Sequence, residues 1–247
     1  MKKCLTIEDG VRAALSVYNF TSDRKWEYVP AGEGELTDKL LLDGEEYPLF
    51  WWRNDTQIMA LYERAAERSL CSMKLNRTCT KSYGLERLMY KEMDIAEFMF
   101  DSQIASVMCF RNGYALNMLA TMENERVAVF ELAAVLHDDT AEQGRHIYWG
   151  EEGMASDRVV SQKIPSEAVY LFREDEEKPE VYNDIFIYMY GLNKNDIVKA
   201  ATIAEILMGR IDISDWRAKD AHYRRCIAAV AESDRDCRRT LVKEVEA

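Results

Sequence analysis

The stretch Tyr90-Lys91-Glu92-Met93-Asp94 carries the residues best suited to binding a polar ligand. Lys91 and Asp94 lie three residues apart, so on a helix they would share one face. An exposed pair of this kind is an ordinary surface ion pair, which stabilises a protein by roughly a few tenths of a kcal/mol. The alternative is a polar pair at the mouth of a ligand pocket. We therefore take Lys91, Asp94 and the neighbouring Tyr90 as candidate ligand-binding residues.

The chain has three histidines, His137, His146 and His222, and none of them has a second histidine at metal-ligand spacing. A single histidine of this kind is more often structural or exposed than catalytic. His146 is the best of the three, because it opens a predicted strand beside a glycine-rich loop. It is our fourth ligand-binding candidate, and the histidines predict no metal site.

The six cysteines form no CxxC pair, so the sequence favours neither a zinc site nor a thioredoxin-like redox pair. Cys109 and Cys226 lie within apolar stretches and are interpreted as small core residues. The chain also lacks the GxSxG, GxxxxGK[ST] and HExxH motifs and the calcium-binding loop of EF-hands. These patterns name no catalytic residue.

A glycine pair in Gly32-Glu33-Gly34 is followed by Glu35 and not by a third glycine. An acidic lining there opposes the backbone N–H groups that would hold a phosphate. We therefore expect that the chain binds no NAD or NADP by itself, and the sequence predicts no cofactor.

The composition indicates a globular protein with an acidic surface. Of its 247 residues, 48% are hydrophobic and 11% are aromatic, and the formal net charge is −12. A negative balance repels phosphate backbones, which argues against nucleic acid as a partner. The sequence shows neither a signal peptide nor an apolar run of about 18 residues, so we expect no membrane partner and a reducing, cytoplasmic location.

The elements that must position these residues form an α+β architecture: a large, mainly antiparallel sheet with helices on one face, preceded by a small α/β segment. We expect the small segment to cover residues 1–80 and the larger domain to cover residues 81–247. Helices are predicted to begin at Thr6, and over residues 55–70, 83–100, 195–208 and 215–235. Strands are predicted over residues 25–29, 71–78, 104–111, 115–122, 126–136, 146–149 and 168–172, with an Asp43-Gly44 turn between two apolar runs, a loop over 150–158 and a last edge strand at 240–245.

Four segments in order carry a family resemblance. They are a helix at 90–98, a hairpin formed by 115–122 and 127–134, a strand and turn at 146–153, and a last helix at 223–233. From about Tyr83 to the C-terminus, the chain resembles the C-terminal α/β domain of the Gfo/Idh/MocA oxidoreductases, a family of sugar and polyol dehydrogenases. The resemblance implies a sugar-like ligand beside the helix at 90–98, where the family carries a His three residues before an Asp.

The departures from the family are equally informative. Lys91 stands at the position of the family's His, so that residue's proton-transfer role does not carry over. The GxGxxG loop of a Rossmann half and the Glu-Lys-Pro motif are missing, which makes residues 1–80 a reduced nucleotide domain or an unrelated extension. We expect an oxidoreductase-like protein that binds a sugar or polyol, or that partners a true dehydrogenase. The alternatives are an active oxidoreductase with its cofactor at a subunit interface, and a purely structural interaction protein.

The predicted strand Arg126–Leu136 has apolar residues in both alternation phases. A sheet with one solvated face would show polar residues in one phase. Either the chain's own helices and loops cover both faces, or one face is buried against another subunit, as sheets of the resembled family commonly are. We expect a homo-oligomer joined through the open face, with Phe130 or Leu132 as the position to test unless that phase faces the helices.

Overall fold

The structure of the chain is a computed structural model that describes residues 6–66, 70–140, 142–151, 153–157, 168–173, 180–183 and 192–245. It divides into two compact units, each built from two pieces of the chain. The first unit combines residues 1–56 with 184–220, and the second combines residues 57–183 with 221–247. The structure therefore places the division differently from the boundary expected near residue 80, because residues 70–80 form a strand of the second unit's sheet.

The first unit contains a small antiparallel sheet in the order β1-β2-β3 and two helices that pack together, α1 and α4. The predicted capping box is confirmed, because Thr6 and Asp9 exchange side-chain and backbone hydrogen bonds at the start of α1. Asp43 and Gly44 both adopt positive φ angles, 55° and 88°, as a tight hairpin turn requires. The described elements of this unit are α1 (Ile7–Val17), β1 (Trp26–Val29), β2 (Lys39–Leu42), β3 (Glu45–Pro48), η1 (Trp51–Asn54) and α4 (Lys194–Leu207).

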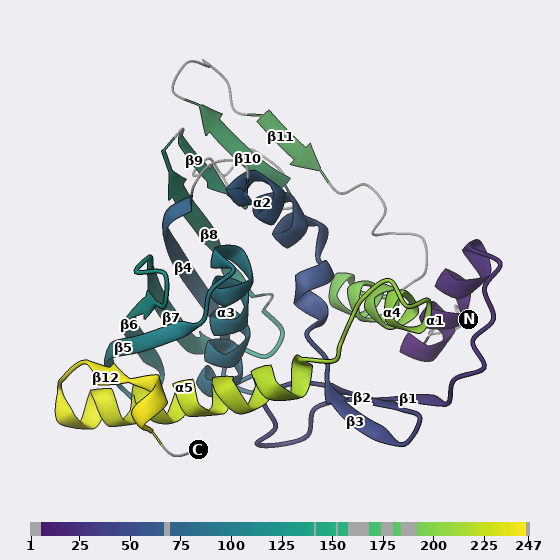
Figure 1. Cartoon of the computed structure of the whole chain (residues 1–247), viewed down its shortest axis with the longest axis horizontal. Coiled ribbons are helices and arrows are strands. Elements are labelled where there is room, and N and C mark those ends of the chain that lie inside the picture. The colour runs from purple at the N-terminus through teal and green to yellow at the C-terminus, as the bar shows by residue number, and fades with distance from the viewer. Residues whose placement is uncertain are drawn as a thin grey trace. The chain divides into compact units, whose positions relative to one another are not determined.

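The second unit is built on a large sheet with the described strand order β11-β10-β9-β8-β4-β7-β6-β5-β12 (Figure 1). Its strands are β4 (Leu70–Thr80), β5 (Ile104–Arg111), β6 (Ala115–Met122), β7 (Val127–Leu136), β8 (Gln143–Gly150), β9 (Gly153–Ser156), β10 (Ala168–Arg173), β11 (Glu180–Asn183) and β12 (Thr240–Leu241). The helices of the second unit are α2 (Thr56–Ala66), α3 (Leu85–Phe100) and α5 (Trp216–Asp236). Helix α2 begins at the unit boundary, and only residues 221–236 of α5 belong to the second unit. The predicted α+β class is confirmed.

All described strand pairs of the large sheet are antiparallel except one. β4 runs parallel to β7 on one side and antiparallel to β8 on the other. The connection from β4 to β7 passes through α3, which contacts β4, β6 and β7. This crossover places one long helix across the middle of the sheet.

The two faces of this sheet differ in what covers them. In β7, Ala128, Phe130, Leu132 and Ala134 are buried on the face against α3, which we call the covered face. Phe130 and Leu132 are only 0% and 1% exposed and face the chain's own helix, so the stated exception applies and the oligomer has to be tested at residues of the opposite phase. The opposite side, the open face, carries exposed large apolar residues on four strands: Met108, Phe110, Leu119, Val135 and Trp149.

Helix α5 closes one edge of the covered face. Ser233 Oγ accepts a hydrogen bond from the backbone N–H of Cys109, and Asp234 Oδ1 accepts one from the N–H of Arg111. After α5, the short strand β12 pairs with β5 and a turn of 3-10 helix at Val242–Glu244 follows. The predicted final edge strand is thus present but spans two residues.

Several local predictions differ from the structure. The loop predicted over residues 150–158 contains strand β9, because residues 153–156 pair with both β8 and β10. The apolar residues at 51–52 open the 3-10 turn η1 instead of extending a strand, and α4 begins one residue earlier than predicted, with Asn193 as its N-cap. Among the described residues, no helix has both the length and the apolar character needed to cross a membrane.

Candidate functional site

Strand β8 and the residue before it place His146 and Glu142 on the covered face. Side chains two apart on a strand point to the same side, so His146, Gly144 and the preceding Glu142 share a face. His146 lies opposite Leu75 of β4, and Gly144 lies opposite Arg77. Arg77 therefore belongs to this face as well, in a row whose other members are apolar.

Gly144 makes room for this arrangement. Its φ is 127°, and a Cβ built at this position would lie 2.0 Å from the backbone oxygen of Asn76. Only glycine fits such a close approach of two strands. The position opposite Arg77 consequently has no side chain, and the guanidinium reaches past it to Glu142, with Nη2–Oε1 and Nε–Oε1 distances of 2.7 and 2.8 Å.

His146 is held by two carboxylates from different elements. Its Nδ1 lies 2.7 Å from Asp157 Oδ2, and its Nε2 lies 2.7 Å from Oε2 of Glu92 in α3. The backbone N–H of His146 also donates to Asp157 Oδ1 at 2.7 Å. With the ring only 1% exposed, these contacts fix its orientation on both sides.

Lys91 completes the group, because its Nζ lies 3.0 and 3.2 Å from the two carboxylate oxygens of Glu142. Arg77 also lies 3.7 Å from Glu92 and 3.8 Å from Asp157. Three cationic and three carboxylate side chains thus form one buried network, which we call the charge cluster: Arg77, Lys91, Glu92, Glu142, His146 and Asp157.

The charge cluster keeps its members ionised. Burial alone would lower the pKa of His146, but the charges of Glu92 and Asp157 outweigh it and raise the pKa to about 9. Burial would raise the pKa of Glu142, but Lys91 and Arg77 lower it to about 2. At neutral pH the cluster therefore holds a charged imidazolium together with the charged carboxylate of Glu142.

One carboxylate oxygen of the charge cluster accepts no hydrogen bond from any described residue. Within the described part of the chain, Glu92 Oε1 is a buried carboxylate oxygen without a hydrogen-bond donor. Buried carboxylate oxygens are normally hydrogen-bonded, and an unmatched one costs free energy. The cluster thus combines this acceptor oxygen of Glu92 with the guanidinium donors of Arg77 3.7 Å away, and hydroxyl groups require an acceptor and a donor of this kind.

The four sequence-predicted ligand residues reach different places. Lys91 and His146 are joined through the charge cluster, although they lie far apart in sequence. Asp94 is fully buried, and Lys91 is 6% exposed, so the exposed surface-pair interpretation of these two residues does not hold. Tyr90 is also fully buried and packs edge-on against the ring of Tyr223 in α5, at a centroid distance of 5.5 Å.

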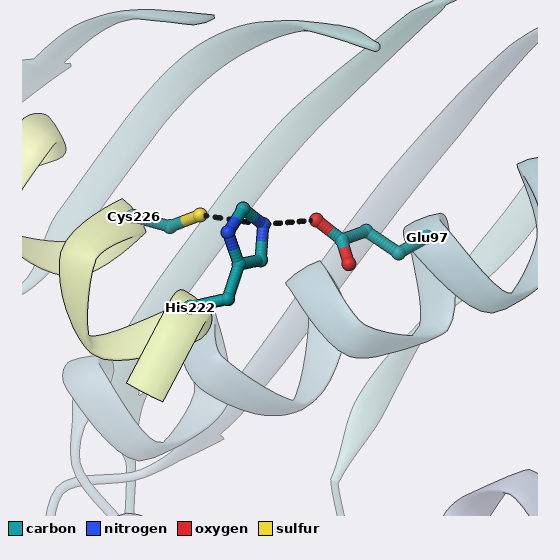
Figure 2. Close-up of side chains that lie close together, drawn as sticks. All are labelled: Glu97, His222 and Cys226. Carbon is teal, nitrogen blue, oxygen red and sulfur yellow. Dashed lines mark hydrogen bonds and ion pairs between the residues drawn. The ribbon is translucent and has the colours of Figure 1, made fainter. Parts of the chain in front are cut away.

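A second polar cluster lies where α3 meets α5 (Figure 2). His222 Nε2 lies 2.6 Å from Glu97 Oε1 and 3.4 Å from Cys226 Sγ. The imidazole ring sits between the carboxylate and the sulfur, and all three side chains are buried. Burial raises the pKa of the Cys226 thiol well above its ordinary value, with a further contribution from the charge of Glu97.

Glu97 is positioned by two further donors. The backbone N–H of Ile104 donates to its Oε1 at 2.7 Å, and the hydroxyl of Tyr223 donates to its Oε2 at 3.0 Å. Sequence reasoning missed this cluster, although His222 and Cys226 are spaced four residues apart on one predicted helix. That spacing places both side chains on one face, which was the available signal.

A separate open cleft of about 690 Å³ lies within the first unit. It is lined by residues of α1, of segment 19–22 and of β1, including Glu8, Arg12 and Trp26. None of the four predicted ligand residues lines it. Where α3 meets the sheet, the described residues form the charge cluster, and the ligand pocket predicted there stays a prediction.

The acidic glycine segment lies between β1 and β2 and not between a strand and a helix. The backbone N–H of Gly32 donates to Oε2 of Glu35 at 2.9 Å, and Glu35 is in turn paired with Lys39. A carboxylate of the chain itself thus uses a backbone donor of the kind that a phosphate would need.

No protein-family model and no curated protein matches the chain. Solved structures do match it in fold. An oxidoreductase from Agrobacterium radiobacter in complex with NAD+, L-tartaric acid and magnesium has a TM-score of 0.61 and 13% identity, and the match covers 78% of this chain and 64% of that one. Levoglucosan dehydrogenase in complex with NADH and levoglucosan has a TM-score of 0.60 and 12% identity, covering 78% and 65%. Aldose-aldose oxidoreductase from Caulobacter crescentus complexed with glycerol has a TM-score of 0.56 and 14% identity, covering 77% and 62%.

These similarities establish a fold shared with Gfo/Idh/MocA-type oxidoreductases of sugars and polyols. The chain spans less than two thirds of the length of the solved structures that it matches. The matched part is nevertheless larger than residues 81–247 alone, so the likeness is not limited to the region in which the sequence resemblance was found.

Proposed function

We propose that this chain is a Gfo/Idh/MocA-like protein that binds a sugar- or polyol-like ligand at the charge cluster and does not bind a dinucleotide by itself. The observation that carries the proposal is the joining of Lys91 and His146 in one buried polar network. The sequence predicts both residues as ligand-binding candidates. Lys91 lies in α3 and His146 lies in β8, and the network connects these two elements. The proposal extends to this chain the sugar and polyol chemistry of its structural neighbours.

The chemistry of the charge cluster suits hydroxyl groups. A polyol hydroxyl donates one hydrogen bond and accepts others, so it needs an acceptor and a donor side by side. Glu92 Oε1 supplies an acceptor, and Arg77 lies 3.7 Å from it as a potential donor. Charge-assisted hydrogen bonds of this kind are roughly twice as strong as neutral ones.

A thermal-shift screen of sugars and polyols on the purified chain tests the ligand. A ligand at 100 times its Kd stabilises a protein by about 2.7 kcal/mol, which is easily detected. We expect at least one polyol to raise the melting temperature and Lys91→Met to weaken its binding at least tenfold. Lys74→Met is the matched control, because Lys74 pairs with Glu131 on the open face of the sheet. Equal affinity in wild type and Lys91→Met, or no hit in the screen, would overturn the ligand assignment.

The lack of autonomous dinucleotide binding has its own test. We expect no saturable binding of oxidised or reduced NAD or NADP at micromolar concentration. The segment around Gly32 supports this expectation, since Glu35 already occupies a backbone donor there. Isothermal titration with all four nucleotides decides the point, and micromolar binding of any of them would reject it.

We further propose that the chain forms a homo-oligomer through the open face of the large sheet. Leu119 and Phe110 are 45% and 55% exposed there, on neighbouring strands. Large apolar residues gathered on one sheet face are typical of subunit interfaces. A stable interface of this kind buries more than about 1,000 Å² and most often obeys two-fold symmetry.

Light scattering at micromolar concentration tests the oligomer. We expect a mass that is a multiple of 28.6 kDa, and a shift toward the monomer mass in Leu119→Lys. Val17→Lys is the control, because Val17 is 67% exposed on α1 in the other unit. A monomeric wild-type chain would exclude this interface.

Association with a complete dehydrogenase subunit is an alternative to direct ligand binding, favoured by the lack of a GxGxxG loop in the sequence. The two proposals differ in a simple observation. Co-purification of a full-length dehydrogenase with this chain would favour the partner, whereas a polyol hit on the isolated chain favours direct ligand binding.

A further inference from the structure

The cluster between α3 and α5 combines three kinds of donor atom that transition metals bind. Glu97, His222 and Cys226 each offer one ligand atom, and these three atoms lie within 4.8 Å of one another. They come from two helices packed together in the second unit. We propose that these three side chains form a binding site for one transition-metal ion, and that Zn²⁺ is the ion that the donor set fits best.

The chemistry of the donors selects the class of metal. A thiolate is a soft ligand that binds Zn²⁺ well and is not used by Mg²⁺ or Ca²⁺, which take oxygen ligands. Imidazole and carboxylate complete a set that zinc commonly uses. Three protein ligands leave one tetrahedral position for water or a small ligand, which is the pattern of zinc sites with an open position.

One of the three distances between the ligand atoms already matches that of a coordinated ion. Zinc binds sulfur at about 2.3 Å and nitrogen or oxygen at about 2.0–2.2 Å, so tetrahedral ligand atoms stand roughly 3.2–3.6 Å apart. The Nε2–Sγ distance of 3.4 Å between His222 and Cys226 already falls in this range. The 2.6 Å between His222 and Glu97 must open by about 0.6 Å, which a small rotation of the carboxylate provides.

The backbone supplies two of the ligands as a preformed pair. His222 and Cys226 are four residues apart in α5, so their side chains project from one face of a rigid helix. Glu97 reaches them from the last turn of α3, oriented by the Ile104 N–H and the Tyr223 hydroxyl. Donors of this kind hold a ligating carboxylate in place, as the outer contacts of metal sites generally do.

Binding requires a defined proton balance. The Cys226 thiol gives up one proton to solvent when its sulfur becomes a ligand, and the imidazole of His222 must carry its remaining proton on Nδ1 so that Nε2 can donate its lone pair. The ion then replaces the hydrogen bonds that Nε2 makes with Glu97 and Cys226. Binding should therefore weaken as the pH is lowered, because protons compete with the metal for the same atoms.

The experiment uses the full chain with its other accessible thiols removed. Cys71 and Cys237 are exposed, so both are replaced by Ser, together with Cys4, which lies outside the described residues. The chelator-treated protein is titrated with Zn²⁺ against a competing dye, and bound metal is counted by mass spectrometry. We expect one Zn²⁺ per chain with submicromolar Kd, and at least a hundredfold weaker binding in Cys226→Ser and in His222→Gln.

Two further measurements separate ligation from a general effect on folding. Cys109→Ser is the matched control, since Cys109 is as buried as Cys226 but lies outside the cluster, and it should keep the wild-type Kd. Co²⁺ loaded into the same thiol-depleted chain should show a thiolate-to-cobalt charge-transfer band that disappears when Cys226→Ser is added. Absence of stoichiometric Zn²⁺ binding, or unchanged binding in folded Cys226→Ser, would show that the three side chains form only a hydrogen-bonded cluster.

Discussion

Two buried histidines approach the same helix and meet very different surroundings. His146 and His222 each place Nε2 within 2.7 Å of a glutamate of α3, Glu92 in one case and Glu97 in the other. Around His146 two further carboxylates and two cations complete the network of charged side chains. His222 has instead a thiol and a single carboxylate, and the neighbouring hydroxyl of Tyr223 donates to that carboxylate.

The difference shows how one helix can support two kinds of buried site. Opposite charges in equal number stabilise one another and hold His146 as a cation. A mixed set of soft and hard donors has less charge to balance, and so is open to a cation from outside. The surroundings of each glutamate, and not the histidine itself, decide which chemistry the site supports.

Removal of His146 should produce the largest effect. His146→Ala leaves Glu92 and Asp157 close together without the imidazolium, and breaking a buried pair in this way costs about 3–5 kcal/mol. We expect the free energy of unfolding, measured with urea, to fall by that amount. His137→Ala is the control, because His137 is exposed. A loss below 1 kcal/mol, on the order of that for a surface residue, would contradict the role given to the charge cluster.

The pH dependence of stability should show the charge on His146 directly. Its pKa is about 9 in the folded chain and 6.5 as an ordinary value, so its contribution is fully present below pH 6.5 and is lost as the pH rises through 9. Each pH unit in this window corresponds to about 1.4 kcal/mol, which gives a loss of about 3 kcal/mol. The wild-type curve should therefore descend more steeply than that of His146→Ala. If stability fell with pH in parallel for the wild type and His146→Ala, the proton responsible would not be bound to His146.

Removal of His222 should cost less. In His222→Ala, Glu97 keeps its hydrogen bonds from Ile104 and Tyr223, so its carboxylate stays partly satisfied. We expect a loss of about 1–3 kcal/mol in metal-free protein, the usual cost of one buried polar group losing a partner. Denaturation in the presence of a chelator measures it, and a loss equal to that of His146→Ala would remove the distinction between the two sites.

The smallest effect is expected on the open face. Lys74 and Glu131 form an ion pair whose side chains are 32% and 36% exposed. Exposed pairs contribute about 0–1 kcal/mol, so Lys74→Ala should leave the free energy of unfolding nearly unchanged. Lys91→Ala should cost more, because Lys91 is itself buried and its Nζ contacts both carboxylate oxygens of Glu142. Equal losses of unfolding free energy in Lys74→Ala and Lys91→Ala would show that burial does not make the ion pair of Lys91 more stabilising than that of Lys74.

Much of the fold could be predicted from periodicity. The strands at 104–111 and 115–122 have their predicted bounds, because a turn with polar residues follows each of them and the first turn also contains a glycine. Strand β9 was missed because its four residues, Gly153–Ser156, have no alternation to detect. It is a strand only because β8 and β10 pair with it, which is tertiary information.

The candidate site was predicted in part. Lys91 and His146 were selected, but Glu142 was not, because β8 begins three residues before the predicted strand and this places residue 142 on the covered face. Arg77 was also missed, since a charged residue in a strand is ordinarily read as solvent-facing. Charged side chains on α3 are buried because the sheet contacts one side of the helix and α5 contacts another. No pattern within a single element contains that information.

The position of β4 also has a consequence for the order in which the chain folds. β5, β6 and β7 are joined by short turns and can pair as soon as they are made, whereas β4 must wait for β7 and then for β8. Distant pairings form slowly because loop-closure entropy opposes them. Arg77 enters with β4 and His146 with β8, so the charge cluster is completed late, when the last of these pairings closes. A growing chain on the ribosome would thus carry Lys91 and Glu92 of α3 without Glu142 and His146 until β8 has emerged.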